Sequence, residues 1–145
     1  MNDFFIRVFM AFNTFLLRAS GGRLGSRLGN QTVLLLHTTG RKSGQERTIP
    51  IAYFRDGDGF FIVASNWGKD HQAAWYLNLK KQPRARLDVD GRAYAVEAHG
   101  AEGDEYTRLW KYATEHHPPY LDYQKMTARQ IPIMVFRPID GSGKE

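Results

Sequence analysis

Hydrophobic and polar positions alternate through much of the chain, and this alternation predicts β-strands. Between residues 84 and 89, alanine, leucine and valine take every second position and charged residues take the others. Because neighbouring side chains on a strand point to opposite faces, this pattern predicts a sheet with one face in water. The pattern and the turn residues predict six strands, over residues 32–38, 48–54, 60–65, 84–89, 92–98 and 131–136.

Two joins between these strands are predicted to be tight hairpins. One contains Asp56-Gly57-Asp58-Gly59 and the other contains Asp90-Gly91. Asp-Gly pairs favour hairpins because they supply the positive φ that a tight primed turn needs. Short strands at this spacing, with few helices between them, favour a mainly β fold that closes into a small barrel with flanking helices.

Two segments between the strands have helical spacing. The first helix is predicted to run through AAWYLNLKK until Pro83, with Asp70 as its N-cap, and the second to run from the N-cap Asp104 until Pro118. The second helix has an apolar face at three- and four-residue steps, formed by Tyr106, Leu109, Trp110 and Ala113. The following segment, HHPPYLDYQ, is expected to be a loop in which Tyr120 and Tyr123 are free to line a pocket.

The first 20 residues form a further candidate helix with a phenylalanine-rich stripe. Asp3, Arg7 and Asn13 interrupt it, so it is too polar to span a bilayer, and it does not have the charge pattern of a signal peptide. The helix is expected to pack on its own domain, to cover a site, or to lie on a membrane surface. These readings place a single domain, residues 1–145 with a flexible tail over 140–145, in the cytoplasm or at the inner face of the membrane.

Composition narrows the classes of function. The 145 residues are 42% hydrophobic, enough for one domain with its own core, and the absence of cysteine excludes disulfides and thiolate metal sites. The histidines lack the spacing of a metal site, so no metal is expected. A net charge of +5 favours an anionic ligand. Nucleic acid is not expected, because the aromatic residues gather in loops and helices instead of alternating with cations on one sheet face.

The segment TTGRKSGQERTIP, residues 38–50, has the composition of a phosphate-binding loop. It places Arg41, Lys42, Ser43 and Arg47 close behind an apolar strand. Guanidinium groups bind phosphate oxygens in pairs, and glycines let backbone N–H groups approach an anion. A basic turn that only stays in water remains the alternative.

A second candidate segment is the corner Ala64-Ser65-Asn66-Trp67-Gly68, where a strand ends before the first helix. Exposed N–H groups at such a corner suit an anion or the polar edge of a heterocycle. An ordinary loop is the alternative here. The following helix adds Trp75, which also fits a core position, and Asn78. No esterase elbow, Walker loop, calcium loop or carboxylate pair is found, which points to chemistry supplied by a cofactor.

Five motifs resemble, in order and spacing, the deazaflavin-dependent nitroreductase family, whose members reduce quinones and nitro compounds with coenzyme F420. They are LLLHTTGRKSGQERTIPI, DGDGFFIVASNWG, AAWYLNLKKQP, PPYLDYQ and IPIMVFRP, and the match covers residues 33–138. The resemblance implies a split β-barrel that transfers a hydride from reduced F420 to a quinone or other activated acceptor. It also implies that Arg41, Lys42, Ser43 and Arg47 hold the phosphate and acidic tail. The ring site would be formed by Ala64, Ser65, Asn66, Trp67, Ala74, Trp75 and Asn78.

The same resemblance places Tyr120 and Tyr123 at the acceptor, with water or a hydroxyl such as that of Ser65 or Tyr120 as the source of the proton. Two departures from the family pattern concern substrate choice: Trp67 adds a large ring beside the site, and His117 stands where nitro-reducing members have tyrosine. An FMN-dependent barrel enzyme and a carrier of flavin, haem or fatty acid remain alternatives. The sequence leaves the choice between monomer and homodimer open.

Overall fold

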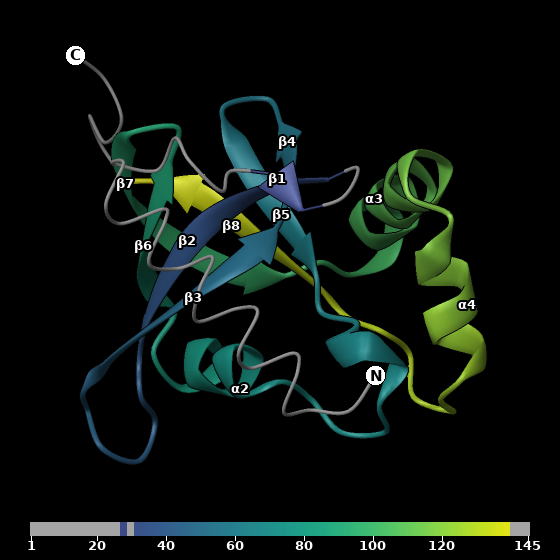
Figure 1. The fold of residues 1–145 in the computed structure, drawn as a ribbon, viewed down its shortest axis with the longest axis horizontal. Coiled ribbons are helices and arrows are strands. Elements are labelled where there is room, and N and C mark those ends of the chain that lie inside the picture. The colour runs from purple at the N-terminus through teal and green to yellow at the C-terminus, as the bar shows by residue number, and fades with distance from the viewer. Residues whose placement is uncertain (1–26, 29–30, 140–145) are drawn as a thin grey trace.

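The computed structural model describes residues 27–28 and 31–139, which form a curled antiparallel sheet with three α-helices (Figure 1). The helix predicted over residues 1–20 and the tail over 140–145 lie outside the described residues. The strands are β1 (Arg27–Leu28), β2 (Gln31–Thr39), β3 (Glu46–Ala52), β4 (Phe54–Asp56), β5 (Gly59–Val63), β6 (Arg84–Val89), β7 (Arg92–Gly100) and β8 (Ile133–Pro138). The helices are α2 (Ala74–Lys81), α3 (Gly103–His116) and α4 (Pro119–Lys125), and a short 3₁₀ turn, η1, spans Asn66–Gly68.

The sheet is curled into a half-barrel (Figure 1). Hydrogen-bonded neighbours follow the order β1-β2-β6-β7-β8-β5-β4, and β3 pairs with β2 outside this path. Only Tyr53 separates β3 from β4, so a continuous stretch of chain links β3, beside β2, to β4, at the far end of this path. The backbone N–H of Tyr53 donates to the carbonyl of Thr32 at 3.3 Å. The architecture is therefore the predicted split β-barrel.

Two apolar cores lie on opposite faces of the same strands. Along β5, Phe60 and Ile62 point into the barrel, while Phe61 and Val63 belong to the cluster beneath α3 and α4. Every residue of β5 is buried for this reason. α3 and α4 lie together on one side of the sheet and α2 lies at one end of the barrel (Figure 1), where its Trp75 and Leu79 join the interior core.

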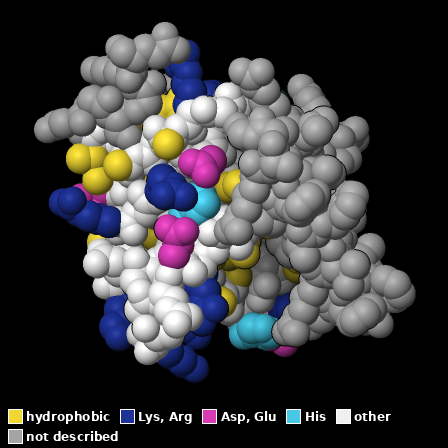
Figure 2. Space-filling view, turned by 60° about the vertical axis from the view of Figure 1, so that its left-hand side comes forward, with side chains coloured by type: hydrophobic (Ala, Val, Ile, Leu, Met, Phe, Trp, Pro, Cys, Tyr) yellow, Lys and Arg dark blue, Asp and Glu magenta, His cyan; other side chains and the backbone are white. Residues whose placement is uncertain are grey.

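The outer face of β2 carries a polar cluster. The His37 side chain is only 5% exposed, and its two ring nitrogens contact Thr48 Oγ1 of β3 at 2.8 Å and Asp88 Oδ2 of β6 at 2.7 Å. A carboxylate can only accept, so the Nε2–H donates to Asp88. Figure 2 looks onto this side, where acidic, basic and histidine side chains gather. The cluster links three neighbouring strands just before the β2–β3 turn.

All six predicted strands are present, although their ends differ. The stretch predicted as 48–54 is divided into β3 and β4 at Tyr53, and the last strand begins at Ile133 instead of Ile131. The short β1 was not predicted. Both Asp-Gly hairpins are confirmed: Gly57 has φ of 64°, and Asp90 and Gly91 have φ of 50° and 82°. These turns were predictable because their signal is local.

Three predictions about helices were wrong. α2 begins at Ala74 after a backbone cap at Ala73, so Asp70 is not its N-cap. α3 begins at Gly103, which places Asp104 inside the first turn, where its charge suits the helix dipole without capping. The segment predicted as a loop forms α4, because Pro118 and Pro119 occupy the start of a helix, where a missing N–H costs nothing.

Candidate functional site

The basic segment forms a tight turn between β2 and β3. The two strands pair as far as Thr39 and Glu46. The backbone N–H of Gly40 then donates to the carbonyl of Gln45 at 2.8 Å, and that of Gly44 donates to the carbonyl of Gly40 at 2.8 Å. Gly44 has φ of +73°, a conformation that favours glycine. The turn therefore has a fixed backbone from which its cations project.

α2 anchors Arg41. The backbone N–H and the guanidinium of Arg41 both donate to Asn78 Oδ1, at 3.1 and 3.0 Å. Asn78 is only 4% exposed, and its amide donates to Thr38 Oγ1 at 3.3 Å. The ammonium of Lys81 donates to the carbonyl of Arg41 at 2.8 Å. Asn78 thus joins the basic turn to the barrel and fixes the position of the Arg41 backbone and guanidinium.

Lys42, Ser43 and Arg47 are exposed on the same turn. Ser43 Oγ accepts from the backbone N–H of Gln45 at 3.2 Å and from the Arg47 guanidinium at 3.4 Å. Arg47 pairs with Thr38 across the strands, so the two residues share one face of the sheet. Because Thr38 contacts α2 on that face, Arg47 lies on the side of the sheet toward α2.

The second candidate segment is a turn in an uncommon backbone conformation. Asn66, Trp67 and Gly68 have φ of 48°, 60° and 78°. Positive φ is uncommon for residues other than glycine and is a true outlier for a bulky one such as tryptophan. The Asn66 amide donates to the carbonyl of His71 at 2.9 Å, and a Cβ on Gly68 would lie 2.9 Å from the sulfur of Met126. This turn is packed from several sides.

Arg129, in the connection between α4 and β8, reaches the same turn. Its guanidinium donates to the carbonyls of Ser65 and Lys69 and to Gln72 Oε1, each at 3.0 Å. Sequence reasoning missed this residue. Its partners lie 57 to 64 positions away, and no local pattern marks it.

A groove joins the basic turn to this uncommon turn. It has a volume of about 450 Å³ and is lined by Arg41, Asn66, Ala74, His71, Gln72, Ala73 and Leu77. It therefore brings together one predicted residue from each of three segments: the basic turn, the corner after β5 and the helix α2. Its volume lies in the range of small-molecule and cofactor sites.

Of the two predicted acceptor residues, Tyr123 lies beside the uncommon turn and Tyr120 lies in the core. Tyr123 is half-buried and its ring meets Trp67 edge-on, with centroids 6.3 Å apart. Trp67 is 48% exposed. Tyr120 was expected to be available in a loop but is 5% exposed and packs in the core beneath α3 and α4. His117 meets Tyr120 at 4.9 Å, and burial lowers the pKa of His117, which favours the neutral imidazole.

Two predicted ring-site residues, Ala64 and Trp75, belong to the barrel core. Ser65 is partly buried, with its carbonyl bonded to Arg129. Roles of these residues toward a cofactor stay predictions, as do those of Tyr120 and Tyr123. The structure does place Arg41, Asn66 and Ala74 on one groove.

Comparisons with known proteins show the family to which the chain belongs. The F420H(2)-dependent quinone reductase family matches residues 10–138. An F420H(2)-dependent quinone reductase of Mycobacterium tuberculosis (strain ATCC 25618 / H37Rv) is 40% identical over 122 residues, covering 81% of this chain and 82% of that protein. A solved F420-H2 dependent reductase (FDR-A) is 33% identical with a TM-score of 0.67, covering 72% of this chain and 93% of its own. A solved domain-swapped dimer is 30% identical with a TM-score of 0.70, covering 88% of this chain and 96% of its own.

Proposed function

We propose that this chain, which belongs to the F420H(2)-dependent quinone reductase family, transfers a hydride from reduced coenzyme F420 to a quinone. The observation that carries the proposal is the groove that runs from Arg41, at the basic turn, to Asn66, at the corner after β5. A long cofactor with an acidic end and a flat ring needs these two environments in one connected site.

The residues fit this cofactor. At the basic turn, Arg41 is fixed by Asn78 while Lys42 and Arg47 are exposed to bind anions. Charge-assisted hydrogen bonds from such groups to phosphate or carboxylate are among the strongest in proteins. F420 has a phosphate and a glutamate tail, so it can use all three cations, whereas FMN offers one phosphate. This difference favours F420 over FMN.

At the other end, the wall of the groove is small and partly polar. The apolar surface comes from α2 and the residue before it: Ala73, Ala74 and Leu77. The amide groups come from Asn66 and Gln72. Such a mixture suits a flat heterocycle, which needs an apolar face and hydrogen bonds at its edge. When bound here, F420H₂ would supply the hydride.

The protein would contribute position and exclusion of water. A donor and an acceptor held in contact react faster because the entropic cost of bringing them together has already been met. Trp67 and Tyr123 form an aromatic wall beside the uncommon turn, where a flat quinone can stack. Ser65, which is partly buried at the start of that turn, would deliver the proton, and Tyr123 would hold the acceptor.

Association with a membrane surface belongs to the proposal as well. Over residues 27–28 and 31–139, no helix is both long and apolar enough to cross a bilayer. The phenylalanine stripe within residues 1–20 would bring the enzyme to prenylated quinones in the cytoplasmic face of the membrane.

The test is a pair of titrations followed by a turnover assay. Purified protein is titrated with F420 and, separately, with FMN, and the oxidation of F420H₂ is then followed with menadione as acceptor. We expect tighter binding of F420 than of FMN, and oxidation of F420H₂ that depends on both protein and menadione. FMN binding as tight as or tighter than F420 binding would overturn the proposal in favour of a flavin enzyme. Binding of F420 without turnover would indicate a carrier.

A further inference from the structure

We propose that Arg129 is a positioning residue for the ring end of the groove: it holds the turn Asn66–Gly68 in its uncommon conformation before any cofactor binds. The inference rests on the proposed function, because it assigns Arg129 a role toward the same cofactor. It goes further in naming a residue, far from the basic turn in sequence, on which the shape of the ring site depends.

The turn needs an external support. Asn66 and Trp67 both have positive φ, at 48° and 60°, and backbone strain of this kind persists only where the surrounding structure fixes it. Within the turn itself, Gly68 N–H donates to the Ser65 carbonyl at 2.9 Å and Lys69 N–H donates to the Asn66 carbonyl at 3.1 Å. These two bonds close one 3₁₀ turn that no regular helix continues, and the Asn66 side chain adds one bond, to the His71 carbonyl at 2.9 Å.

Arg129 supplies that support from outside. Its Nε–H donates to the Lys69 carbonyl and one terminal nitrogen donates to the Ser65 carbonyl, both at 3.0 Å. The two carbonyls belong to the residues on either side of Asn66–Gly68. One rigid, planar guanidinium therefore fixes the distance between the two ends of the turn, which a flexible point charge would not do.

The third contact extends the support to the groove. The other terminal nitrogen of Arg129 donates to Gln72 Oε1 at 3.0 Å, and both Gln72 and Asn66 line the groove. Arg129 thus touches the chain before the turn, after the turn and at the groove wall. It lies behind the site as a support.

The position of Arg129 is itself fixed by α4. Gln124 donates from its amide to the Arg129 carbonyl at 2.7 Å, and its Oε1 accepts from the Ile131 N–H at 2.9 Å. Gln124 holds both sides of the short connection that carries Arg129. These bonds connect the ring end of the groove to α4.

The experiment compares Arg129→Gln and Arg129→Lys with Arg137→Gln. Arg137 is a matched control, because its guanidinium also bridges backbone and side chain, at Asp56, but none of its contacts reaches the groove at η1. Hydrogen exchange of the apo proteins is measured over residues 65–72, and the dissociation constant for F420 is measured at a temperature where each variant is folded.

In Arg129→Gln we expect faster exchange confined to residues 65–72. We also expect the dissociation constant for F420 to rise by roughly 10-fold or more, because binding must then order the turn that the lost charge-assisted contacts held. Arg129→Lys should recover little of either, because an ammonium lacks the planar fork. Arg137→Gln should bind F420 like the wild type.

Three outcomes would count against this inference. Wild-type affinity in both Arg129 variants would overturn it while leaving the proposed function intact. Full recovery in Arg129→Lys would show that charge alone suffices and would overturn the positioning role. Wild-type protein that does not bind F420 would overturn the proposed function and this inference with it.

Discussion

At the scale of single residues, the groove depends on polar side chains whose hydrogen bonds are already satisfied. Asn78 is the clearest case: its Oδ1 accepts twice from Arg41 and its amide donates to Thr38. An aspartate could not donate to Thr38, and a leucine could bind neither partner. The buried amide therefore holds Arg41 in one defined position. Lys42 and Arg47 are exposed, so their side chains are free to adapt to a ligand.

We predict that Arg47→Ala weakens cofactor binding much more than it weakens folding. Arg47 is exposed and its contact to Ser43 is long, at 3.4 Å, so little stability depends on it. Loss of a charged hydrogen bond to phosphate costs about 1.5 to 3 kcal/mol, which raises the dissociation constant roughly 10-fold or more. Fluorescence titration with F420 and thermal unfolding of the apo protein measure the two effects.

The control for this prediction is Arg84→Ala. Arg84 is an exposed cation on β6, so its removal changes the net charge equally without touching the basic turn. It should leave F420 affinity nearly unchanged. Equal losses of F420 affinity in both variants would indicate general electrostatic attraction instead of a contact at Arg47. Unchanged affinity in Arg47→Ala would mean that the turn is only a solvated hairpin without a role in binding.

At the scale of elements, the strands and hairpins were predictable and several connections were not. Alternation and Asp-Gly pairs are local signals, and they located β6, β7 and the turn between them. The left-handed turn at Asn66–Gly68 has a partial local signal, since asparagine and glycine tolerate positive φ, but Trp67 between them conceals it. Arg129 has no local signal at all, because its function comes from contacts that only the fold creates.

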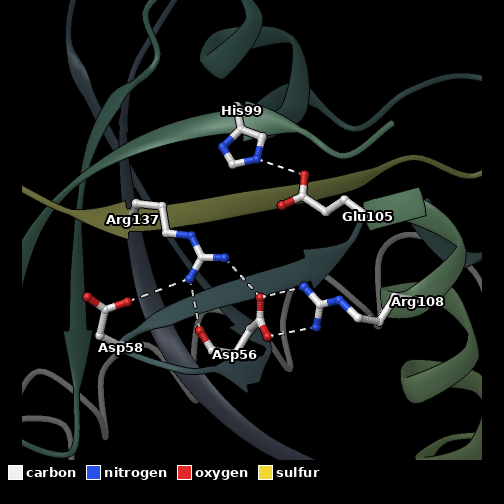
Figure 3. Close-up of polar contacts among 6 residues, drawn as sticks. All are labelled: Asp56, Asp58, His99, Glu105, Arg108 and Arg137. Atoms are coloured by element: carbon white, nitrogen blue, oxygen red, sulfur yellow. Dashed lines mark hydrogen bonds and ion pairs between the residues drawn. The ribbon is translucent and has the colours of Figure 1, made fainter. Parts of the chain in front are cut away.

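Among elements, one carboxylate joins three of them. Asp56, at the β4–β5 turn, accepts from Arg108 of α3 at 2.9 and 3.1 Å and from Arg137 of β8 at 2.9 Å (Figure 3). Hydrogen bonds from Arg108, followed by those from Arg137, hold the pKa of Asp56 below its ordinary value of 3.8, against the opposing effect of burial.

We predict that this network stabilises the fold in a pH-dependent way. Because the pKa of Asp56 is lower in the folded state, its contribution is present above pH 3.8 and is lost as pH falls through the lowered value. Asp56→Asn should therefore lower the unfolding temperature by a few degrees at pH 7. Its difference from the wild type should shrink on acidification below the ordinary pKa, as thermal unfolding from neutral to acidic pH would show.

Asp58→Asn is the matched control for this prediction. Asp58 is 88% exposed and approaches Arg137 only at 3.6 Å, so its replacement should change the unfolding temperature little at any pH, as expected for an exposed ion pair. If Asp56→Asn lowers the unfolding temperature by the same amount at every pH, packing and not charge is responsible for the effect.

At the scale of the whole molecule, a rigid barrel carries a site made from its connections. β5 and β8 are buried on both faces by two separate cores, so the scaffold resists deformation. The groove-lining residues instead lie on the β2–β3 turn and on the segment from Asn66 to Leu77. The barrel therefore serves as the scaffold that holds these connections in place.

The net charge of +5 leads to a last prediction, that cofactor binding depends on salt and acceptor use does not. F420 has several negative charges and, in the proposed site, would meet Arg41, Lys42 and Arg47, whereas menadione is neutral. Raising ionic strength from 0.1 to 1 M shortens the screening length from about 10 to about 3 Å, so the dissociation constant for F420 should rise several-fold. The KM for menadione at saturating cofactor should stay constant, because menadione has no charge for salt to screen.

The Arg47→Ala variant is the control for this prediction and should show a smaller salt effect on F420 binding than the wild type. Salt-independent binding would mean that the basic turn does not hold the acidic tail, and the tail would then have to lie elsewhere on the barrel.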